Sequence, residues 1–318
     1  MFRKIFTAAV TLVLTASIFA GCSAPEKDNG RLSVVCTVFP VFDWTREVIG
    51  DSDNIDLTCL MKGGADLHNY QPSADDMILM SDCDVFICVG GESESWVEDS
   101  LRNARNKDMK VIRLMDVLGS DLREEEVKEG METPEEEEEE EAYDEHIWLS
   151  LRNAEKCTAA IAEKLAEADS VRADTYTKNS EKYSKQLGEL DDMYADMTAN
   201  AANKTLIFGD RFPFRYLFSD YGLDYYAAFS GCSSDSEASF ETIAFLADKC
   251  DELGAEYIFT IDNSDCTIAD AVAASTKKNA PSTLTLYSMQ SVDTNGEEKA
   301  DYYDYMYKNY TQLREALS

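Results

Sequence analysis

The stretch Leu32-Ser-Val-Val-Cys-Thr-Val-Phe39 is apolar and rich in β-branched residues along its length. This composition is typical of a strand buried on both faces of a parallel sheet. A proline follows at position 40, and residues 41–49 then have the apolar spacing of a helix. Further short apolar strands alternate with helical segments as far as residue 114. The sequence therefore predicts an α/β lobe whose ligands bind at the carboxyl ends of the strands.

A second series of strands and helices begins at Thr205 and continues to the terminal helix at 301–317. Before it, residues 171–200 have tyrosine, leucine and methionine at spacings of three and four, and Gly188 is the only glycine or proline among them. A chain of this length usually exceeds one compact core. We expect two α/β lobes, each a mainly parallel four-stranded sheet flanked by helices, at 32–165 and 204–318.

The net charge of -33 favours cations as ligands and excludes nucleic acid as a partner. Part of the charge is a run of seven glutamates, Glu135–Glu141, within an acidic loop at 124–145. The run has no apolar face and is expected to be a solvent-exposed loop, either a plain spacer or a collector of cations. The nine cysteines form no short-spaced pairs, so most are predicted to be small buried hydrophobes.

The N-terminus has the features of a secretory signal, with two cations, an apolar run from Ile5 to Ala20, and then Gly21 and Cys22. The run is too short to be a convincing membrane span. Ile18-Phe-Ala-Gly-Cys22 resembles a bacterial lipobox, which implies that Cys22 is lipidated and holds the chain on the extracytoplasmic face of the cell membrane. Residues 23–31 would be a flexible tether. The alternative is simple cleavage of the signal beside an incidental cysteine.

The chain has only two histidines. His68 lies in Gly64-Ala-Asp-Leu-His-Asn-Tyr-Gln-Pro72, just after a predicted strand, and His146 lies in Asp144-Glu-His-Ile-Trp-Leu149. If the two imidazoles converge, they offer two nitrogen ligands to a divalent metal. Their ring nitrogens must then lie within ~5 Å, because each would be ~2.1 Å from the ion. The alternative is a pair of structural histidines.

These two stretches, together with Val38-Phe-Pro-Val-Phe42, resemble the metal-binding lipoproteins of ABC importers. These are zinc and manganese solute-binding proteins, some of which are called adhesins, and the resemblance runs from about Leu32 to the C-terminus. It implies that His68 and His146 bind Zn²⁺ or Mn²⁺ outside the membrane and that a permease receives the ion. It also implies that a linking helix at 166–203 joins the lobes and limits hinge motion. We expect a monomer with no catalytic step.

The sequence departs from this family at two ligand positions. The family has a histidine followed by an aspartate after the first strand of the second lobe, where this chain has Gly209 and Asp210. The natural substitute ligand is Asp210, unless it pairs with Arg211 or Arg215. Glu237 and Asp262 are further carboxylate candidates.

The second missing ligand is an aspartate two residues after a tyrosine, where this chain reads Tyr287-Ser-Met-Gln290. Met289 is a soft thioether and is predicted to pack in the interior. Metal binding is expected to weaken below about pH 6, since neutral imidazole and ionised carboxylate are required.

Other functions share parts of this pattern. Two imidazoles and a carboxylate also describe a zinc-dependent hydrolase with an open coordination site, with Glu145 as its base. The wide separation of the histidines along the chain argues against that class. Two further alternatives remain. One is a surface adhesion lipoprotein, and the other is a paralogue of the metal-binding lipoproteins that binds a chelate or no metal.

Overall fold

Strand β1 (Leu32–Cys36) lies inside the first sheet of the computed structural model, which describes residues 30–132, 142–233, 237–295 and 300–318. The sheet has the order β2-β1-β3-β4, with β2 at Ile55–Cys59, β3 at Val85–Cys88 and β4 at Lys110–Arg113. All neighbouring strands are parallel. The four-stranded parallel sheet predicted for the first lobe is therefore confirmed.

The helices of the first lobe start where local chemistry favours a helix terminus. Helix α2 (Phe39–Ile49) begins two residues earlier than expected, because Pro40 lies in its first turn, where its missing N–H costs nothing. Ser73 and Asp76 form the predicted capping box of α3 (Ala74–Asp82). Helix α4 (Trp96–Arg102) was also expected, whereas the short α5 (Leu114–Leu118) was not.

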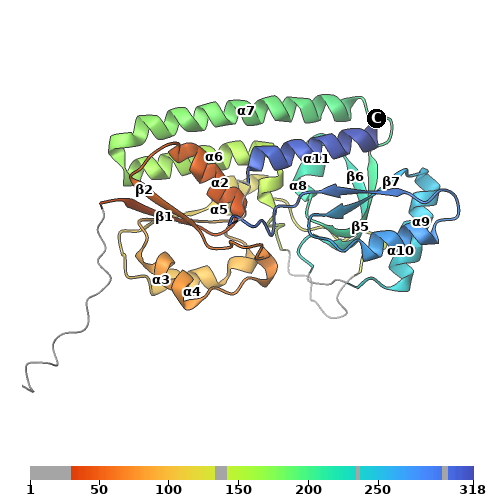
Figure 1. Cartoon of the computed structure of the whole chain (residues 1–318), viewed down its shortest axis with the longest axis horizontal. Helices are drawn as coiled ribbons and strands as arrows, with labels where there is room; N and C mark the ends of the chain where they lie inside the picture. Colours follow the sequence, from red (N-terminus) through yellow and green to blue (C-terminus); the bar gives the residue numbers. More distant parts are fainter. Residues whose placement is uncertain (1–29, 133–141, 234–236, 296–299) are drawn as a thin grey trace, which may run out of the picture. The chain divides into compact units, whose positions relative to one another are not determined.

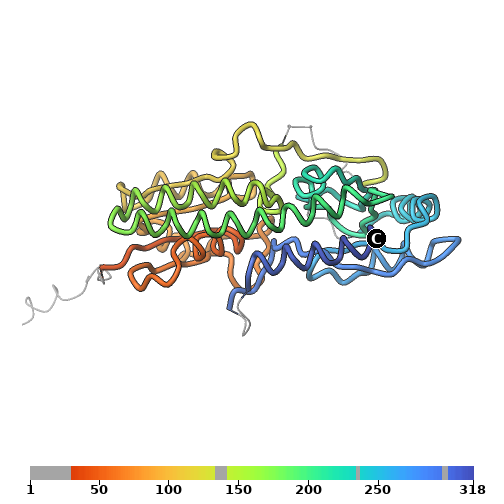
Figure 2. The backbone as a smooth tube through the Cα atoms, turned by 90° about the horizontal axis from the view of Figure 1, so that it is seen from above, coloured from red at the N-terminus to blue at the C-terminus, as the bar shows by residue number. Residues whose placement is uncertain are grey.

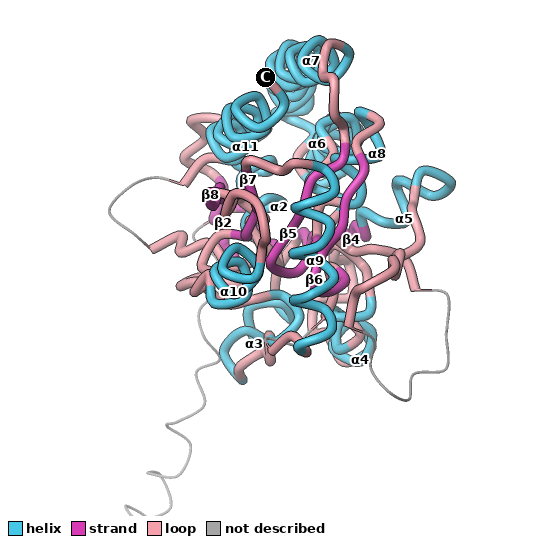
Figure 3. The backbone as a smooth tube through the Cα atoms, turned by 90° about the vertical axis from the view of Figure 1, so that its right-hand side faces the viewer, coloured by secondary structure: helices cyan, strands magenta, loops and turns pink. Residues whose placement is uncertain are grey.

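The second sheet repeats the arrangement, with the order β6-β5-β7-β8 and parallel pairing throughout. Its strands are β5 (Thr205–Phe212), β6 (Asp224–Ser230), β7 (Tyr257–Ile261) and β8 (Ser282–Leu286). Helices α9 (Phe240–Leu253) and α10 (Thr267–Ser275) contact each other and the strands (Figure 3), while α8 (Arg215–Tyr221) follows β5 directly. The predicted fold class is confirmed for both lobes.

Three long helices pack together beside the two sheets. Helix α6 (Leu151–Ala168) packs along α7 (Ala173–Ala199), the helix predicted to link the lobes, and α11 (Tyr302–Leu317) lies beside α7. Figures 1 and 2 show α7 passing over both sheets, and it contacts α2 of the first lobe as well as α8 of the second. Short 3-10 turns complete the fold, at Leu67–Asn69, Glu92–Glu94, Gly119–Asp121, Ile147–Leu149 and Ser170–Arg172. The lobe limits at 165 and 204 stay a prediction.

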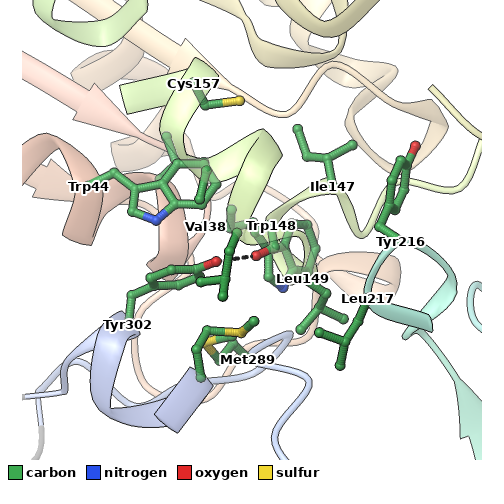
Figure 4. Packing of buried hydrophobic residues seen from close by; sticks show 14 of the residues in the cluster. Val38, Trp44, Ile147, Trp148, Leu149, Cys157, Tyr216, Leu217, Met289 and Tyr302 are labelled. Carbon is green, nitrogen blue, oxygen red and sulfur yellow. Dashed lines mark hydrogen bonds between the residues drawn. The ribbon is translucent and has the colours of Figure 1, made fainter. Parts of the chain in front are cut away.

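One hydrophobic core extends from the first lobe into the second and includes Trp44, Trp148 and Tyr302. Figure 4 shows these rings together, with the Tyr302 hydroxyl donating to the carbonyl oxygen of Trp148 over 2.5 Å. The backbone N–H of Tyr302 donates to Asp43 over 2.8 Å. The start of α11 is thus tied to the first lobe by buried hydrogen bonds, which limits motion of one lobe against the other.

Among the described cysteines, none forms a disulfide. Six are buried, as predicted for small hydrophobes: Cys36, Cys59, Cys83, Cys88, Cys157 and Cys250. Cys22 and the glutamate run at 135–141 lie outside the described residues. No helix within the described ranges has the length and apolar character needed to cross a membrane.

Candidate metal centre

His68 lies in a 3-10 turn that follows β2, at the carboxyl end of the first sheet. The turn is held by Leu67, which is fully buried, and by Asp66, whose Oδ1 accepts the backbone N–H of His68 over 2.9 Å. The ring is half-buried, and its Nδ1 lies 2.9 Å from the Ser93 hydroxyl. Its Nε2 is therefore directed away from Ser93 and is available to another partner.

His146 is fully buried and directly precedes the turn Ile147–Leu149, whose three side chains are also fully buried. Its ring Nδ1–H donates to Oδ1 of Asp144 over 3.0 Å. A carboxylate partner fixes the imidazole with its proton on Nδ1 and its lone pair on Nε2. Nε2 is the nitrogen that a metal ligand requires.

The two histidines converge as the sequence predicts. Their Nε2 atoms lie 3.1 Å apart, well within the limit of ~5 Å for sharing one ion. The side-chain nitrogen of Gln290 lies 3.0 Å from Nε2 of His68 and 2.5 Å from Nε2 of His146. With Nδ1 of His68 donating to Ser93 and Nδ1 of His146 donating to Asp144, the Nε2 lone pairs of both rings meet at one point, where a cation would be favoured.

Gln290 reaches this point because of the backbone turn before it. Met289 has a φ of 59°, which is uncommon outside glycine, and its side chain is fully buried in the core, as predicted. The carbonyl oxygen of Ser288 accepts the indole N–H of Trp148 over 2.8 Å, which ties this loop to the segment carrying His146. The sequence pattern pointed only to a missing aspartate in this stretch and carried no signal for Gln290.

Cys232 is the second residue beside the histidines that the sequence pattern did not indicate. Ligand atoms of His68, His146 and Cys232 all lie within 4.8 Å of one another, and no other such group of His, Cys, Asp or Glu occurs in the described parts of the chain. The neighbouring Gly231 permits this approach, because a Cβ there would lie 2.9 Å from the carbonyl oxygen of Phe212 and 3.2 Å from the His146 ring. In the sequence, the only local signal for this contact was a glycine directly before the cysteine.

The three predicted carboxylate ligands lie outside that group. Asp210 accepts the backbone N–H groups of Arg211 at 2.8 Å and Ile261 at 3.4 Å, and Asp262 accepts both the N–H and the hydroxyl of Ser288 at 2.6 and 2.7 Å. Both aspartates line a cavity of about 420 Å³ that Gln290 also lines. Glu237 is exposed to solvent. A direct role as ligands stays a prediction for all three.

Gly209 stands where the family has a histidine, and the structure gives a packing reason for the glycine. A Cβ at this position would lie 2.5 Å from Cα of Ala269 in α10, and such an approach is too close for any side chain. Arg211, two residues later, directs its guanidinium towards Asp66 at 3.3 Å rather than to Asp210. The alternative pairing of Asp210 with the side chain of Arg211 is therefore wrong, since only the backbone N–H of Arg211 reaches Asp210. The other arginine considered, Arg215, pairs with Glu126 at 3.1 Å.

The electrostatics of the pair suit a metal ligand. Burial, the facing ring of His146 and, to a smaller extent, Arg211 lower the pKa of His68, and Asp66 opposes them; the net result is a pKa of about 3. The ring is consequently neutral at physiological pH without any metal. The expectation that metal binding weakens below about pH 6 stays a prediction.

A buried carboxylate links the two histidine segments. Oε1 of Glu145 accepts the backbone N–H of Ser93 over 2.7 Å, and Ser93 is the residue that contacts His68. Gly91 makes room for this side chain, since a Cβ there would lie 2.4 Å from the Glu145 carboxyl carbon. Burial raises the pKa of Glu145. The residue considered as the base of a hydrolase thus has a positioning role.

A family model, curated relatives and solved structures all match this chain to the same family of proteins. The family model described as "Zinc-uptake complex component A periplasmic" matches residues 34–316. The zinc-binding lipoprotein AdcA of Streptococcus pneumoniae is 30% identical over 303 residues, which are 95% of this chain and 59% of AdcA. The chain thus spans somewhat more than half of that relative.

A relative of similar length is the high-affinity zinc uptake system protein ZnuA of Bacillus subtilis, 27% identical with 100% of this chain and 99% of ZnuA covered. Among solved structures, the Zn(II)-bound ZnuA-like domain of AdcA from S. pneumoniae superimposes with a TM-score of 0.70 at 28% identity, covering 91% of this chain and 99% of that domain.

Proposed function

The chain belongs to this family of periplasmic zinc-uptake components, and from that premise we propose that it is the solute-binding protein of a metal ABC transporter. It captures Zn²⁺ outside the cytoplasm and delivers the ion to a permease. The observation that supports this proposal most strongly is the 3.1 Å separation of the two Nε2 atoms of His68 and His146. A family of uptake components, rather than of enzymes, also agrees with a site that needs no catalytic step.

Zinc is preferred over manganese in this proposal because of the donor atoms. Two neutral imidazoles suit Zn²⁺, whereas Mn²⁺ prefers carboxylate and carbonyl oxygen. The aspartates at positions 210 and 262 line the adjacent cavity and already accept backbone hydrogen bonds. We propose that they, with the net charge of -33, attract the cation towards the site rather than complete its coordination.

The proposal includes attachment to the membrane. Cys22, at the end of the lipobox-like stretch, would carry the lipid, and residues 23–31 would be the tether to the folded lobes. The protein would act as a monomer on the outer face of the membrane. Detergent partitioning of the full chain and of a Cys22→Ala variant tests this part: the variant should leave the detergent phase.

The metal site is tested by element analysis of protein purified without chelator. We expect about one zinc per chain, and at least about tenfold lower occupancy in His68→Ala and in His146→Ala, since each removes one of few ligands. Asn69→Ala is the matched control, because Asn69 is exposed and lies in the same turn as His68. Full occupancy in both histidine variants would overturn the proposal.

A further inference from the structure

We propose that Cys232 is the third ligand of the captured ion: its Sγ binds zinc together with Nε2 of His68 and of His146, and Oε1 of Gln290 completes a four-coordinate shell. This inference rests on the proposed function and specifies the chemistry of the same site. It replaces a missing histidine and a missing aspartate by a thiolate and an amide oxygen.

The positions of the sulfur and the two nitrogens support a shared ion. All three ligand atoms lie within 4.8 Å of one another. In a tetrahedral site with Zn–N at ~2.1 Å and Zn–S at ~2.3 Å, the ligand atoms are roughly 3.5 Å apart. The Sγ atom therefore has to approach by at most about 1.3 Å, the scale of a rotamer adjustment. Its backbone is already held, since the N–H of Cys232 donates to Glu125 over 3.0 Å.

Gln290 provides the second, independent observation. Its side chain is 3% exposed, and its Oε1 is buried without a hydrogen-bond partner, while its nitrogen faces both rings. A buried acceptor without a partner destabilises the protein, because it has lost its hydrogen bonds to water without replacing them. A half-turn of the amide exchanges the oxygen and the nitrogen and would direct the oxygen at the point where the two imidazole lone pairs meet. An ion at that point satisfies the oxygen and both rings.

The binding step balances as a simple exchange. The S–H bond of Cys232 breaks, a Zn–S bond forms, and the proton leaves to solvent, so no oxidant or reductant is required. Before the ion arrives the thiol is neutral, because burial and the carboxylates of Asp144 and Glu125 raise the pKa of Cys232. The site then holds zinc with one negative ligand and three neutral ones.

This donor set determines which ions the protein takes. Thiolate and imidazole favour Zn²⁺, Co²⁺ and Cd²⁺, whereas Mn²⁺ binds sulfur poorly. We expect a roughly hundredfold excess of Mn²⁺ to leave bound zinc in place. Mn²⁺ gains little from the thiolate, and the loss of one effective ligand lowers metal affinity by up to about 100-fold. Displacement of zinc by equimolar Mn²⁺ would contradict a thiolate ligand.

The test uses Co²⁺ as a spectroscopic probe on the full chain. Wild type should show the near-ultraviolet charge-transfer band of a cobalt–thiolate bond, and Cys232→Ser should lose it and bind zinc at least about tenfold more weakly. Cys266→Ser is the matched control, because Cys266 is the other half-buried free cysteine in the described residues and lies outside the metal-ligand group. It should keep both the band and the affinity.

The outcomes separate this inference from the proposed function. If wild type binds no zinc or cobalt, the proposed function fails. If wild type binds one ion that depends on His68 and His146 but shows no thiolate band, only the assignment of Cys232 fails. Gln290→Leu keeps the side chain's size and removes its oxygen, and unchanged zinc affinity in this variant would remove the amide from the shell. Circular dichroism of each variant verifies that the fold is retained.

Discussion

Oδ1 of Asp144 accepts two hydrogen bonds from the same residue, the backbone N–H of His146 at 2.8 Å and its ring Nδ1–H at 3.0 Å. Asp144 is 1% exposed and His146 is fully buried, so water cannot substitute for this carboxylate. The pair therefore orients the imidazole and holds its lone pair towards His68 before any ion binds.

Asp144→Asn should lower zinc affinity by about 10- to 100-fold, the usual effect of losing a carboxylate behind a metal-bound histidine. The amide keeps the size of the side chain but removes its charge. The imidazole of His146 is then held less firmly, and its Nε2 donates its lone pair to zinc more weakly. Competition titration with a zinc chelator measures the change. Asp121→Asn, at an exposed position on the first lobe, should have no effect. Equal affinity in Asp144→Asn and wild type would contradict the role given to this contact.

The imidazole of His68 should stay neutral in the metal-free protein well below its ordinary pKa. Its pKa is lowered to about 3 from 6.5. Below pH 6.5 the unfolded chain therefore binds a proton that the folded chain does not, and the free energy of unfolding falls as pH decreases towards 3. Imidazole ¹⁵N resonances can be followed by NMR from about pH 7 to 4. The imidazole signal that is absent from His68→Gln belongs to His68. A titration midpoint of this signal near pH 6 would refute the expectation.

Glu94→Gln should stabilise the metal-free protein at neutral pH and have little effect in acid. Glu94 is 2% exposed, and burial raises its pKa to about 7 from 4.5. Its contribution to stability is complete below pH 4.5 and is lost as pH rises through 7, because only the unfolded chain ionises freely. The gain on substitution should reach about 1–3 kcal/mol above pH 7.

Urea unfolding in the presence of a chelator, at pH values on both sides of this range, measures the Glu94 effect. The exposed Glu163→Gln on α6 is the control and should leave the free energy of unfolding unchanged at each pH. A stabilisation by Glu94→Gln that is equal in acid and at neutral pH would show that ionisation is not its cause.

Gly209→Ala should destabilise the second lobe by about 1–3 kcal/mol, because the added methyl group overlaps the backbone of α10. Gly188→Ala is the opposite case. A Cβ there meets nothing closer than 3.8 Å, and alanine in the middle of α7 should stabilise the protein by about 0.5–1 kcal/mol. Thermal unfolding of both variants measures the difference. A higher melting temperature in Gly209→Ala would show that α10 shifts to accommodate the methyl group at little cost.

Much of the fold could be predicted because its signals are local. The buried strands have continuous apolar runs, α7 has a stripe at helical spacing, and Ser73 and Ser239 provide side-chain caps for α3 and α9. The helices α5 and α8 were missed: α5 has only five residues, too few for a periodic pattern, and α8 follows β5 after a two-residue connection in a largely aromatic and apolar stretch. Both histidines of the candidate site were found for a similar reason: the chain has no others, and their flanking residues resemble a family pattern.

Two parallel α/β lobes, the linking helix and the pair of histidines thus follow from local sequence patterns. The residues that lie beside the histidines follow from packing between loops. Cys232 and Gln290 reach the histidines through a close approach at Gly231 and a left-handed backbone at Met289, while Asp210 and Asp262 accept backbone hydrogen bonds. The physical reason is that apolar periodicity depends on neighbours along the chain. A coordination shell depends on distances of a few ångströms between loops that only packing brings together.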